Sequence, residues 1–186
     1  MSYKTKERIF RAAARIIREK KVDDLTLEEV ASEAELSKGG LLYHFPTKDA
    51  LIQGLIDHYE ELFGEELKNE MEKLPDGDKK PLTAYINALF NFQSASHELS
   101  QGVLAATLLN PNLLAPVQQR LATFTLKHSK HLKDEYEADI IRLAADGLWL
   151  EEILELNSIS DDKRARIKDK LKGMAKEVEA DDGLYD

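Results

Sequence analysis

The hydrophobic positions along the chain recur every three to four residues, which is the period of an α-helix. Near the start, Ile9, Ala13 and Ile17 share one apolar face, while arginines repeat on another. We therefore predict an amphipathic helix over about 4–20. No alternating apolar and polar run of useful length occurs, so the pattern favours an all-α fold.

Capping residues predict two short helices after the first one. Thr26 precedes a short apolar pattern and Glu29 follows three residues later, which is the signature of a capping box. Ser37 is placed to cap a third helix, and Pro46 ends it by disfavouring helical geometry at Phe45. Two short helices joined by a tight turn, after a basic helix, predict a helix-turn-helix.

Longer helical patterns occupy the rest of the chain. Thr47 can cap a helix that starts at Lys48 and continues for about 25 residues, until the segment 75–78 breaks it. Further helical stretches are predicted near 81–95, 97–109, 114–134, 136–156 and 160–179. The pattern thus predicts about nine helices in all.

The composition is that of a globular protein. With 186 residues, 42% of them hydrophobic, the chain can bury a core and is too apolar to be disordered. It has no apolar run long enough for a membrane span and no apolar signal segment after Met1, so we expect a cytoplasmic protein with no membrane partner. The absence of cysteine excludes disulfides and thiolate metal sites.

The net charge of −9 hides an uneven distribution of charged residues. Taken alone, an acidic total argues against a nucleic-acid partner. Residues 1–22, however, carry eight Lys and Arg against two Glu, a net charge of +6. The first 48 residues carry +2 and the remaining 138 carry −11. A basic front end on an acidic body indicates two functional parts, although a basic helix face can also be simply solvated.

The predicted third helix has the features of a helix that meets DNA. It begins with the sequence SKGG at 37–40, whose two glycines let the backbone approach the major groove. The amide groups at a helix start also attract phosphate. Tyr43, His44 and Lys48 would then offer a hydroxyl, a ring and an ammonium group. For Tyr43 and His44, the alternative is a packing role, for His44 against the first helix.

The block SKGGLLYHFPTKDAL at 37–51 is a specific combination of residues. Matching positions upstream are Ile9, Ala12, Ala13, Leu25, Thr26, Val30, Ala31 and Ala34. With these residues, the stretch 5–51 resembles the DNA-binding domain of TetR-family transcriptional regulators. The resemblance implies an all-helical homodimer. A helix-turn-helix domain over 1–47 would bind operator DNA, and a domain over 48–186 would bind a small molecule and dimerise through the last two long helices.

The resemblance also implies which residues contact double-stranded DNA: Thr26, Ser37, Lys38, Gly39, Gly40, Leu42, Tyr43, His44 and Lys48. Three positions depart from the family pattern. Glu35 stands where the turn usually has glycine, and a left-handed backbone there would cost roughly 1 kcal/mol. Gly40 offers no side chain for base reading, and Leu42 replaces a common aromatic residue. Base reading is therefore expected from Lys38, Tyr43 and His44.

In the acidic body, polar and aromatic side chains stand among aliphatic ones. By family resemblance, eight of them would line a pocket for a small-molecule effector: Tyr85, Phe92, Gln93, His97, Thr107, Phe124, His128 and Trp149. Such pockets are mostly apolar with a few orienting polar groups, and the alternative for each residue is ordinary core. Asp146 could pair with a cationic ligand, lie in solvent or lie at a dimer seam.

Two histidines, His128 and His131, share one helix face and suggest a metal site. Zinc sites need three or four ligands with a supporting shell, and Lys127 and Lys130 nearby disfavour a cation. We therefore expect no metal and no cofactor. The chain also has no GxSxG, P-loop or HExxH pattern, so a small helical enzyme that keeps the helix-turn-helix as packing is not expected.

These features lead to one hypothesis about function. The chain would be a ligand-responsive transcriptional repressor that binds a palindromic operator as a homodimer and is released by a small-molecule effector, with the helix from Lys48 as the lever. The helix near 136–156 is apolar on more than one side, which predicts full burial and a subunit interface. The alternative is a helical protein-interaction module that does not bind DNA.

Overall fold

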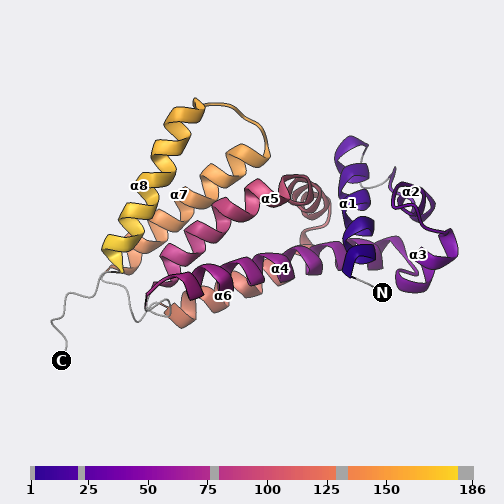
Figure 1. The fold of residues 1–186 in the computed structure, drawn as a ribbon, viewed down its shortest axis with the longest axis horizontal. Helices are drawn as coiled ribbons and strands as arrows, with labels where there is room; N and C mark the ends of the chain where they lie inside the picture. Colours follow the sequence, from indigo (N-terminus) through magenta and orange to yellow (C-terminus); the bar gives the residue numbers. More distant parts are fainter. Residues whose placement is uncertain (1–2, 21–23, 76–79, 129–133, 180–186) are drawn as a thin grey trace. The chain divides into compact units, whose positions relative to one another are not determined.

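The computed structural model of the protein describes residues 3–20, 24–75, 80–128 and 134–179. Every regular element in these ranges is a helix (Figure 1). The elements are α1 (Tyr3–Glu19), α2 (Leu27–Glu33), α3 (Lys38–His44), α4 (Lys48–Lys73), α5 (Pro81–Leu109), the 3₁₀ helix η3 (Pro111–Leu114), α6 (Ala115–His128), α7 (Glu135–Ile153) and α8 (Asp161–Val178). The predicted all-α fold is confirmed. Among these helices, none combines the length and apolarity needed to cross a membrane.

The helix starts lie where the capping signals place them. The Thr26 hydroxyl accepts a hydrogen bond from the Glu29 amide at 3.2 Å, and the Ser37 hydroxyl accepts one from the Gly40 amide at 3.1 Å. Thr47 caps α4 in the same way. Each bond satisfies one of the amide groups that a helix start leaves without a partner.

Helix α5 differs from its prediction as two separate helices over 81–95 and 97–109. The structure has one helical element whose only non-helical backbone among its described residues is at Ser96, with φ −133° and ψ 28°. The Ser100 hydroxyl donates to the Ser96 carbonyl oxygen at 3.0 Å. The predicted break is therefore a kink within a helix.

The helix predicted over 114–134 also differs in the structure, because a short 3₁₀ helix precedes it. Asn110 caps the short η3, and α6 follows directly. The end of the predicted helix, at 129–133, lies outside the described residues. Helices α7 and α8 lie within the predicted stretches 136–156 and 160–179 to within one residue at their starts.

Packing divides the chain into two compact units. Unit 1 comprises Met1–Leu62 and Ser96–Gln119, and unit 2 comprises Phe63–Ala95 and Arg120–Asp186. Helices α4 and α5 each contribute residues to both units. These packing units differ from the predicted functional domains 1–47 and 48–186, which stay a proposal.

The core of unit 1 is built around α1. Its inward residues Ile9 and Phe10 are fully buried, and the Phe10 ring lies edge-on to Phe45 with centroids 5.5 Å apart. The second half of α5 approaches α1 closely, since a Cβ added at Gly102 would lie 2.6 Å from the Cα of Ala14. Only glycine allows the two backbones to come so near.

The core of unit 2 joins parts of α4 and α5 with α7 and α8. Phe63 packs edge-on against Tyr85 and Phe92, with ring centroids 5.9 and 5.6 Å apart. The buried carboxylate of Glu179 closes this core by accepting hydrogen bonds from the Thr83 amide at 3.0 Å, from its hydroxyl at 2.7 Å and from the Leu82 amide. Glu179 thus caps the start of α5 from a distant part of the sequence.

Helix α7 is apolar on two sides, as its sequence pattern predicts, and its full burial at a subunit interface stays a prediction. One side buries Ala138, Ile141, Ala145, Leu148 and Ile153. A second apolar side is open, with Ile140 64% exposed and Leu143 58% exposed. The apolar pattern on two sides was predicted correctly, but in this chain only one of them finds a covering surface.

Candidate functional site

Helix α3 turns one apolar residue inward and most of its other side chains outward. Leu41 is fully buried, whereas Tyr43 is 84% exposed and Leu42 is 37% exposed. Lys38 and His44 are also exposed. A recognition helix requires this arrangement, since its outer side chains must reach base edges while its inner side anchors it.

The rings of Tyr43 and His44 lie edge to face, with centroids 4.9 Å apart. Both residues are exposed, so neither packs into the unit 1 core as the alternative reading expects. Phe45, by contrast, is partly buried against Phe10. The pair Tyr43 and His44 is therefore open to a partner at the last turn of α3.

Lys38 is tied to α2 by an ion pair. Its Nζ lies 2.8 Å from Oε2 of Glu28, and both side chains are largely exposed. The hydrogen bond and the charge of Lys38 lower the pKa of Glu28 below its ordinary value. An approaching phosphate or base would have to compete with this carboxylate for the lysine.

The two glycines of α3 have different surroundings. A Cβ added at Gly39 would meet nothing within 4 Å, whereas one at Gly40 would lie 3.1 Å from the Ser37 hydroxyl oxygen. A side chain at Gly40 would therefore press on the helix cap. This gives a structural reason for a residue that offers no side chain to DNA.

The remaining predicted DNA contacts frame α3. Thr26 and Ser37 are exposed while they cap α2 and α3, so each hydroxyl lies at the surface near amides that could face phosphate. Lys48 is half-buried at the start of α4. All nine predicted DNA contacts thus lie within unit 1 and at its surface in full or in part.

The turn between α2 and α3 has the left-handed backbone that the glycine position suggested. Glu35 has φ 51°, and the amide of Leu36 donates to the Ala31 carbonyl oxygen at 2.8 Å. The Glu35 amide donates to the Ser32 carbonyl oxygen at 3.0 Å. This is a Schellman motif with glutamate at the position that favours glycine, at a cost of roughly 1 kcal/mol.

The arginines of α1 are paired with carboxylates, so the basic face of this helix is not simply solvated. Arg8 pairs with Glu35, Arg11 with Glu7, Arg15 with Glu33 and Arg18 with both Glu19 and Glu98, over 2.7–3.5 Å. Much of the charge of the basic front end is thus neutralised within unit 1. Arg8 and Glu28 are functional candidates that the sequence pattern missed, because their partners are 27 and 10 residues away.

A buried histidine lies beneath α1. His58 on α4 is 2% exposed, and its ring centroid is 5.0 Å from that of Phe10. Burial lowers the pKa of His58 below its ordinary 6.5, although Glu61 at 3.6 Å favours the charged form. His58 is therefore neutral in the folded protein near pH 7.

Tyr85, one of the predicted effector residues, packs against Phe63 and forms a polar contact in unit 2. The Tyr85 hydroxyl donates to Asp146 Oδ1 at 2.7 Å, and Arg142 donates to Asp146 Oδ2 at 3.0 Å. Asp146 therefore has a cation from its own helix. The ion pair with Arg142 occupies the carboxylate that a cationic ligand would use, and a place at a dimer seam stays a prediction.

Two further predicted effector residues of unit 2 carry buried polar atoms. Gln93 is 5% exposed and Trp149 is partly buried. Among the described residues, Oε1 of Gln93 and Nε1 of Trp149 have no hydrogen-bond partner. Phe92 is buried against Phe63. Buried polar atoms without partners are uncommon, and a ligand can satisfy them.

The other four predicted effector residues are not in this group. His97 and Thr107 belong to unit 1, where the Thr107 hydroxyl donates to the Leu104 carbonyl oxygen at 2.9 Å. The side chains of Phe124 and His128 lie outside the described part of the chain, as does His131. Among the described residues, no cluster of three or more potential metal ligands occurs.

The chain matches two protein-family models. The model described as "Bacterial regulatory proteins, tetR family" matches residues 9–55, and the model described as "Tetracyclin repressor-like, C-terminal domain" matches residues 79–176. The second match alone covers more than half of the chain. The protein belongs to the TetR family of DNA-binding transcriptional regulators, and these matches indicate a transcription factor rather than an enzyme.

Known proteins of this kind share the sequence or the fold. The uncharacterized HTH-type transcriptional regulator YerO of Bacillus subtilis (strain 168) is 35% identical over 69 residues, which are 37% of this chain and 24% of that protein. A TetR-like transcriptional regulator from Rhodococcus sp. RHA1 is 18% identical, with a TM-score of 0.66 over 92% of this chain and 93% of that one. SmeT in complex with triclosan is also 18% identical, with a TM-score of 0.64 over 98% and 94%. The match to YerO spans about a quarter of that relative, and the two structures show a common fold.

Proposed function

We propose that this protein is a transcriptional repressor that binds a palindromic operator as a homodimer and is released by a small-molecule effector. The observation that carries the proposal is the surface of α3, where Lys38, Tyr43 and His44 are exposed around the single buried anchor Leu41. Two such helices related by a two-fold axis would enter successive major grooves. The site of action would be the cytoplasm, where bacterial DNA lies.

The homodimer is proposed from the open side of α7. Exposed residues recur there at alternating spacings of four and three: Tyr136, Ile140, Leu143, Gly147, Leu150 and Leu154. This spacing forms a continuous stripe along one side of a helix, as in helix pairs that pack along their length. Gly147 has no neighbour within 4 Å of an added Cβ, which leaves room for a second helix. We propose that the stripe packs against a second copy, with α8 alongside.

The effector is proposed to bind in unit 2. Tyr85, Phe92, Gln93 and Trp149 provide aromatic surface and buried polar atoms in this unit. The similar fold of SmeT was determined with triclosan, an example of a small ligand on this fold. The domain over 48–186 would carry this function, and α4 would act as the lever because it contributes to both units. The effector can shift the protein only by its differential affinity for the two states.

DNA binding is tested by selection and titration. The full chain selects duplexes from a random library, and a mobility-shift titration then measures affinity for a selected duplex and for a mixed-sequence duplex at several salt concentrations. We expect enrichment of a palindrome and binding that weakens steeply with salt. Lys48→Ala should lower the salt slope by about one. Lys68→Ala, at an exposed lysine of the same helix, is the matched control.

The contradicting outcome of this selection is specific. Recovery of no sequence, from a protein that is folded and dimeric, would favour the interaction module that binds no DNA. A mobility shift that is equal for selected and mixed duplexes would support charge-driven binding alone.

The homodimer is tested by light scattering after size exclusion. We expect about twice the chain mass of 21.1 kDa. Ile140→Glu and Leu143→Glu should each give monomers, because a charge would be buried in the interface. Asn69→Glu, at an exposed position of α4, should leave the dimer intact. A wild-type monomer at micromolar concentration would contradict the proposal.

A further inference from the structure

We infer that Arg8 is a positioning residue for DNA recognition, because it clamps the left-handed turn that sets the direction of α3. The inference rests on the proposed DNA-binding function and names a residue outside the predicted contact surface. Its basis is the set of contacts that one guanidinium group makes with the turn, together with the small buried area of α3.

The contacts join α1 to the point where the chain leaves α2. Nη2 of Arg8 donates to the Ala34 carbonyl oxygen and lies 2.9 Å from Oε2 of Glu35. It also lies 3.4 Å from the Glu35 carbonyl oxygen. One side chain of α1 thus contacts the C-cap residue of α2, the backbone of the turn and the Glu35 side chain.

The Ala34 carbonyl is a group that the Schellman motif does not use. That motif uses the carbonyl oxygens of Ala31 and Ser32, which accept from the amides of Leu36 and Glu35. A charged donor makes a strong hydrogen bond. Arg8 therefore adds a strong hydrogen bond to the turn from another helix.

The direction of α3 depends on this turn more than on packing. The helix has seven residues, and Leu41 is its single buried side chain. One buried anchor allows the helix to rotate or tilt about it, whereas a fixed backbone at Glu35 determines how the chain enters α3 three residues later. Glu35 holds φ 51°, a conformation that glutamate rarely adopts, and the contacts of Arg8 stabilise the turn in it.

Arg8 is anchored well enough to act as this contact. It follows Glu7 and precedes Ile9 and Phe10, which are both fully buried in the unit 1 core. Its own side chain is 47% exposed, so its substitution leaves no buried charge. Removing Arg8 should therefore release the turn while the unit stays folded.

The test uses Arg8→Gln with Arg11→Gln as a matched control. Both changes remove one positive charge from α1, but Arg11 pairs with Glu7 on its own helix. The probes are a duplex selected by the wild-type chain and a mixed-sequence duplex. We expect Arg8→Gln to weaken binding of the selected duplex roughly tenfold, while Arg11→Gln and all effects on the mixed duplex stay within about twofold.

A rescue separates positioning from stability. Glu35→Gly removes the need for a clamp, since glycine adopts the left-handed turn readily. In that background, Arg8→Gln should weaken specific binding by less than about threefold. A merely stabilising Arg8 would lower the melting temperature, leave the affinity of the folded protein unchanged and gain nothing from the glycine.

Hydrogen exchange tests the clamp without DNA. The amides of Leu36 and Glu35 are bonded to α2 in the turn, so Arg8→Gln should speed their exchange by roughly tenfold, and Arg11→Gln should not. Unchanged exchange in Arg8→Gln overturns the inference. If the selection finds no DNA sequence but exchange rises as expected, the proposed function fails and the clamp stands. If Arg8→Gln does not fold, Glu35→Gln, which weakens the same ion pair, takes its place in both measurements.

Discussion

Two turns of this chain have the same backbone hydrogen bonds but different side-chain contacts. The turn after α2 and the turn after α7 are both Schellman motifs in which a glutamate takes the left-handed position, Glu35 with φ 51° and Glu155 with φ 53°. In each, the amide three residues beyond the last helical residue donates to a carbonyl oxygen in the last turn of the helix. At both turns, a glutamate therefore occupies a backbone conformation that favours glycine.

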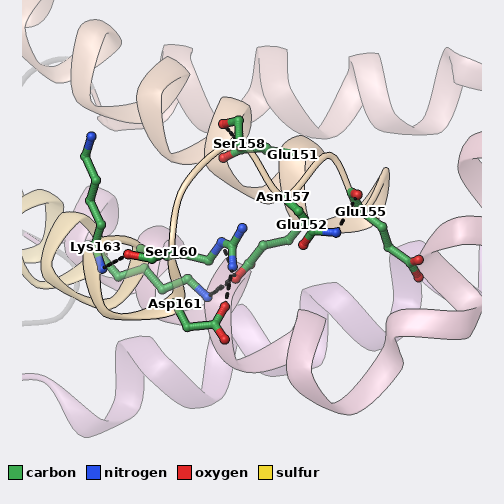
Figure 2. Close-up of polar contacts among 10 residues, drawn as sticks. Glu151, Glu152, Glu155, Asn157, Ser158, Ser160, Asp161 and Lys163 are labelled. Carbon is green, nitrogen blue, oxygen red and sulfur yellow. Dashed lines mark hydrogen bonds and ion pairs between the residues drawn. The ribbon is translucent and has the colours of Figure 1, made fainter.

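The support of the two turns comes from different distances along the chain. The first turn is held by Arg8, which is 27 residues away on α1. The second turn is held by its neighbours, since Asn157 Nδ2 donates to the Glu155 carbonyl oxygen at 2.9 Å and the Ser158 hydroxyl donates to Glu151 (Figure 2). These contacts of the first turn thus come from another helix, and these contacts of the second turn join residues at most seven positions apart.

The difference follows from what each turn connects. Helices α7 and α8 lie side by side in Figure 1, and each buries at least four side chains, so their packing sets their direction. Helix α3 buries one side chain, so its direction must come from the turn. Where a helix must leave most of its surface free for a partner, its orientation depends on a clamp at its end.

The largest effect should come from the ion pairs of the α7–α8 hairpin. Glu152 accepts from Lys168 at 2.8 and 3.0 Å and lies 3.4 Å from Nε of the mostly buried Arg164. Glu152→Ala leaves that arginine with less compensation, and we expect it to lower the free energy of unfolding by about 3 kcal/mol. Urea unfolding of the full chain measures this loss.

The control for Glu152 lies on the same hairpin. Asp162 pairs with Arg166 at 3.1 Å, but both side chains are at least three-quarters exposed. Asp162→Ala should therefore cost less than about 0.5 kcal/mol. Equal losses for the two variants would show that the hairpin does not depend on its buried pair.

The next effect should be equal in the two turns. At both Glu35 and Glu155, the glycine variant should be more stable than the alanine variant by about 1 kcal/mol, because both variants lack the glutamate side chain and only alanine strains a left-handed backbone. Thermal unfolding of the four variants measures the two differences. A clear difference at one position and none at the other would mean that the two turns are not locally equivalent.

A smaller effect should separate the two regions at mildly acidic pH. Burial keeps His58 neutral in the folded state, while the unfolded chain gains a proton near pH 6.5. The contribution of His58 to stability is therefore complete above pH 6.5 and is lost progressively as the pH falls below it. At pH 6, hydrogen exchange should rise slightly in α1 and α4, and less in α7 and α8, whose described residues contain no histidine.

The groups around His58 define the control for this prediction. Glu61, Glu7 and Lys6 also face it, and their charges act on the pKa of His58. His58→Gln should flatten the dependence between pH 7 and pH 6. A slope that persists in this variant would assign the effect to other groups.

The smallest effect should be a sensitivity to salt. Arg15 pairs with Glu33 at 2.7 Å between α1 and α2, and both side chains are over two-fifths exposed. Arg15→Gln should cost about 0.5 kcal/mol at low salt and less at 1 M salt. The loss in Glu152→Ala should change little with salt, since its partners are mostly buried. Equal salt dependence in Arg15→Gln and Glu152→Ala would show that the exposed and the buried ion pairs are screened alike.

Local signals in the sequence predicted most of the fold. The caps at Thr26, Ser37 and Thr47 lie at the predicted helix starts because a cap depends on neighbours within three residues. The break in α5 at Ser96 was also predicted, though as a gap between helices. The exposed side chains of α3 follow from the same local pattern.

The contacts that join distant residues were not predictable in this way. No spacing rule relates Arg8 to Ala34, or Glu179 to Thr83, because each pair meets only when several helices have packed. Burial of the open side of α7 at a subunit interface stays a prediction, since an apolar face shows that cover is needed but not which chain supplies it. The Arg142–Asp146 pair is different, because its residues are four apart on one helix and the local spacing allows their contact.

The bond from Glu179 to the start of α5 also sets an order of events during synthesis. Unit 1 has all of its residues once the ribosome has passed position 119, so α1 and the second half of α5 can already be together. Unit 2 still waits for α7, for α8 and for the carboxylate of Glu179, 96 residues after its partner Thr83. A chain released before Glu179 would have a complete unit 1 and a unit 2 that lacks this contact.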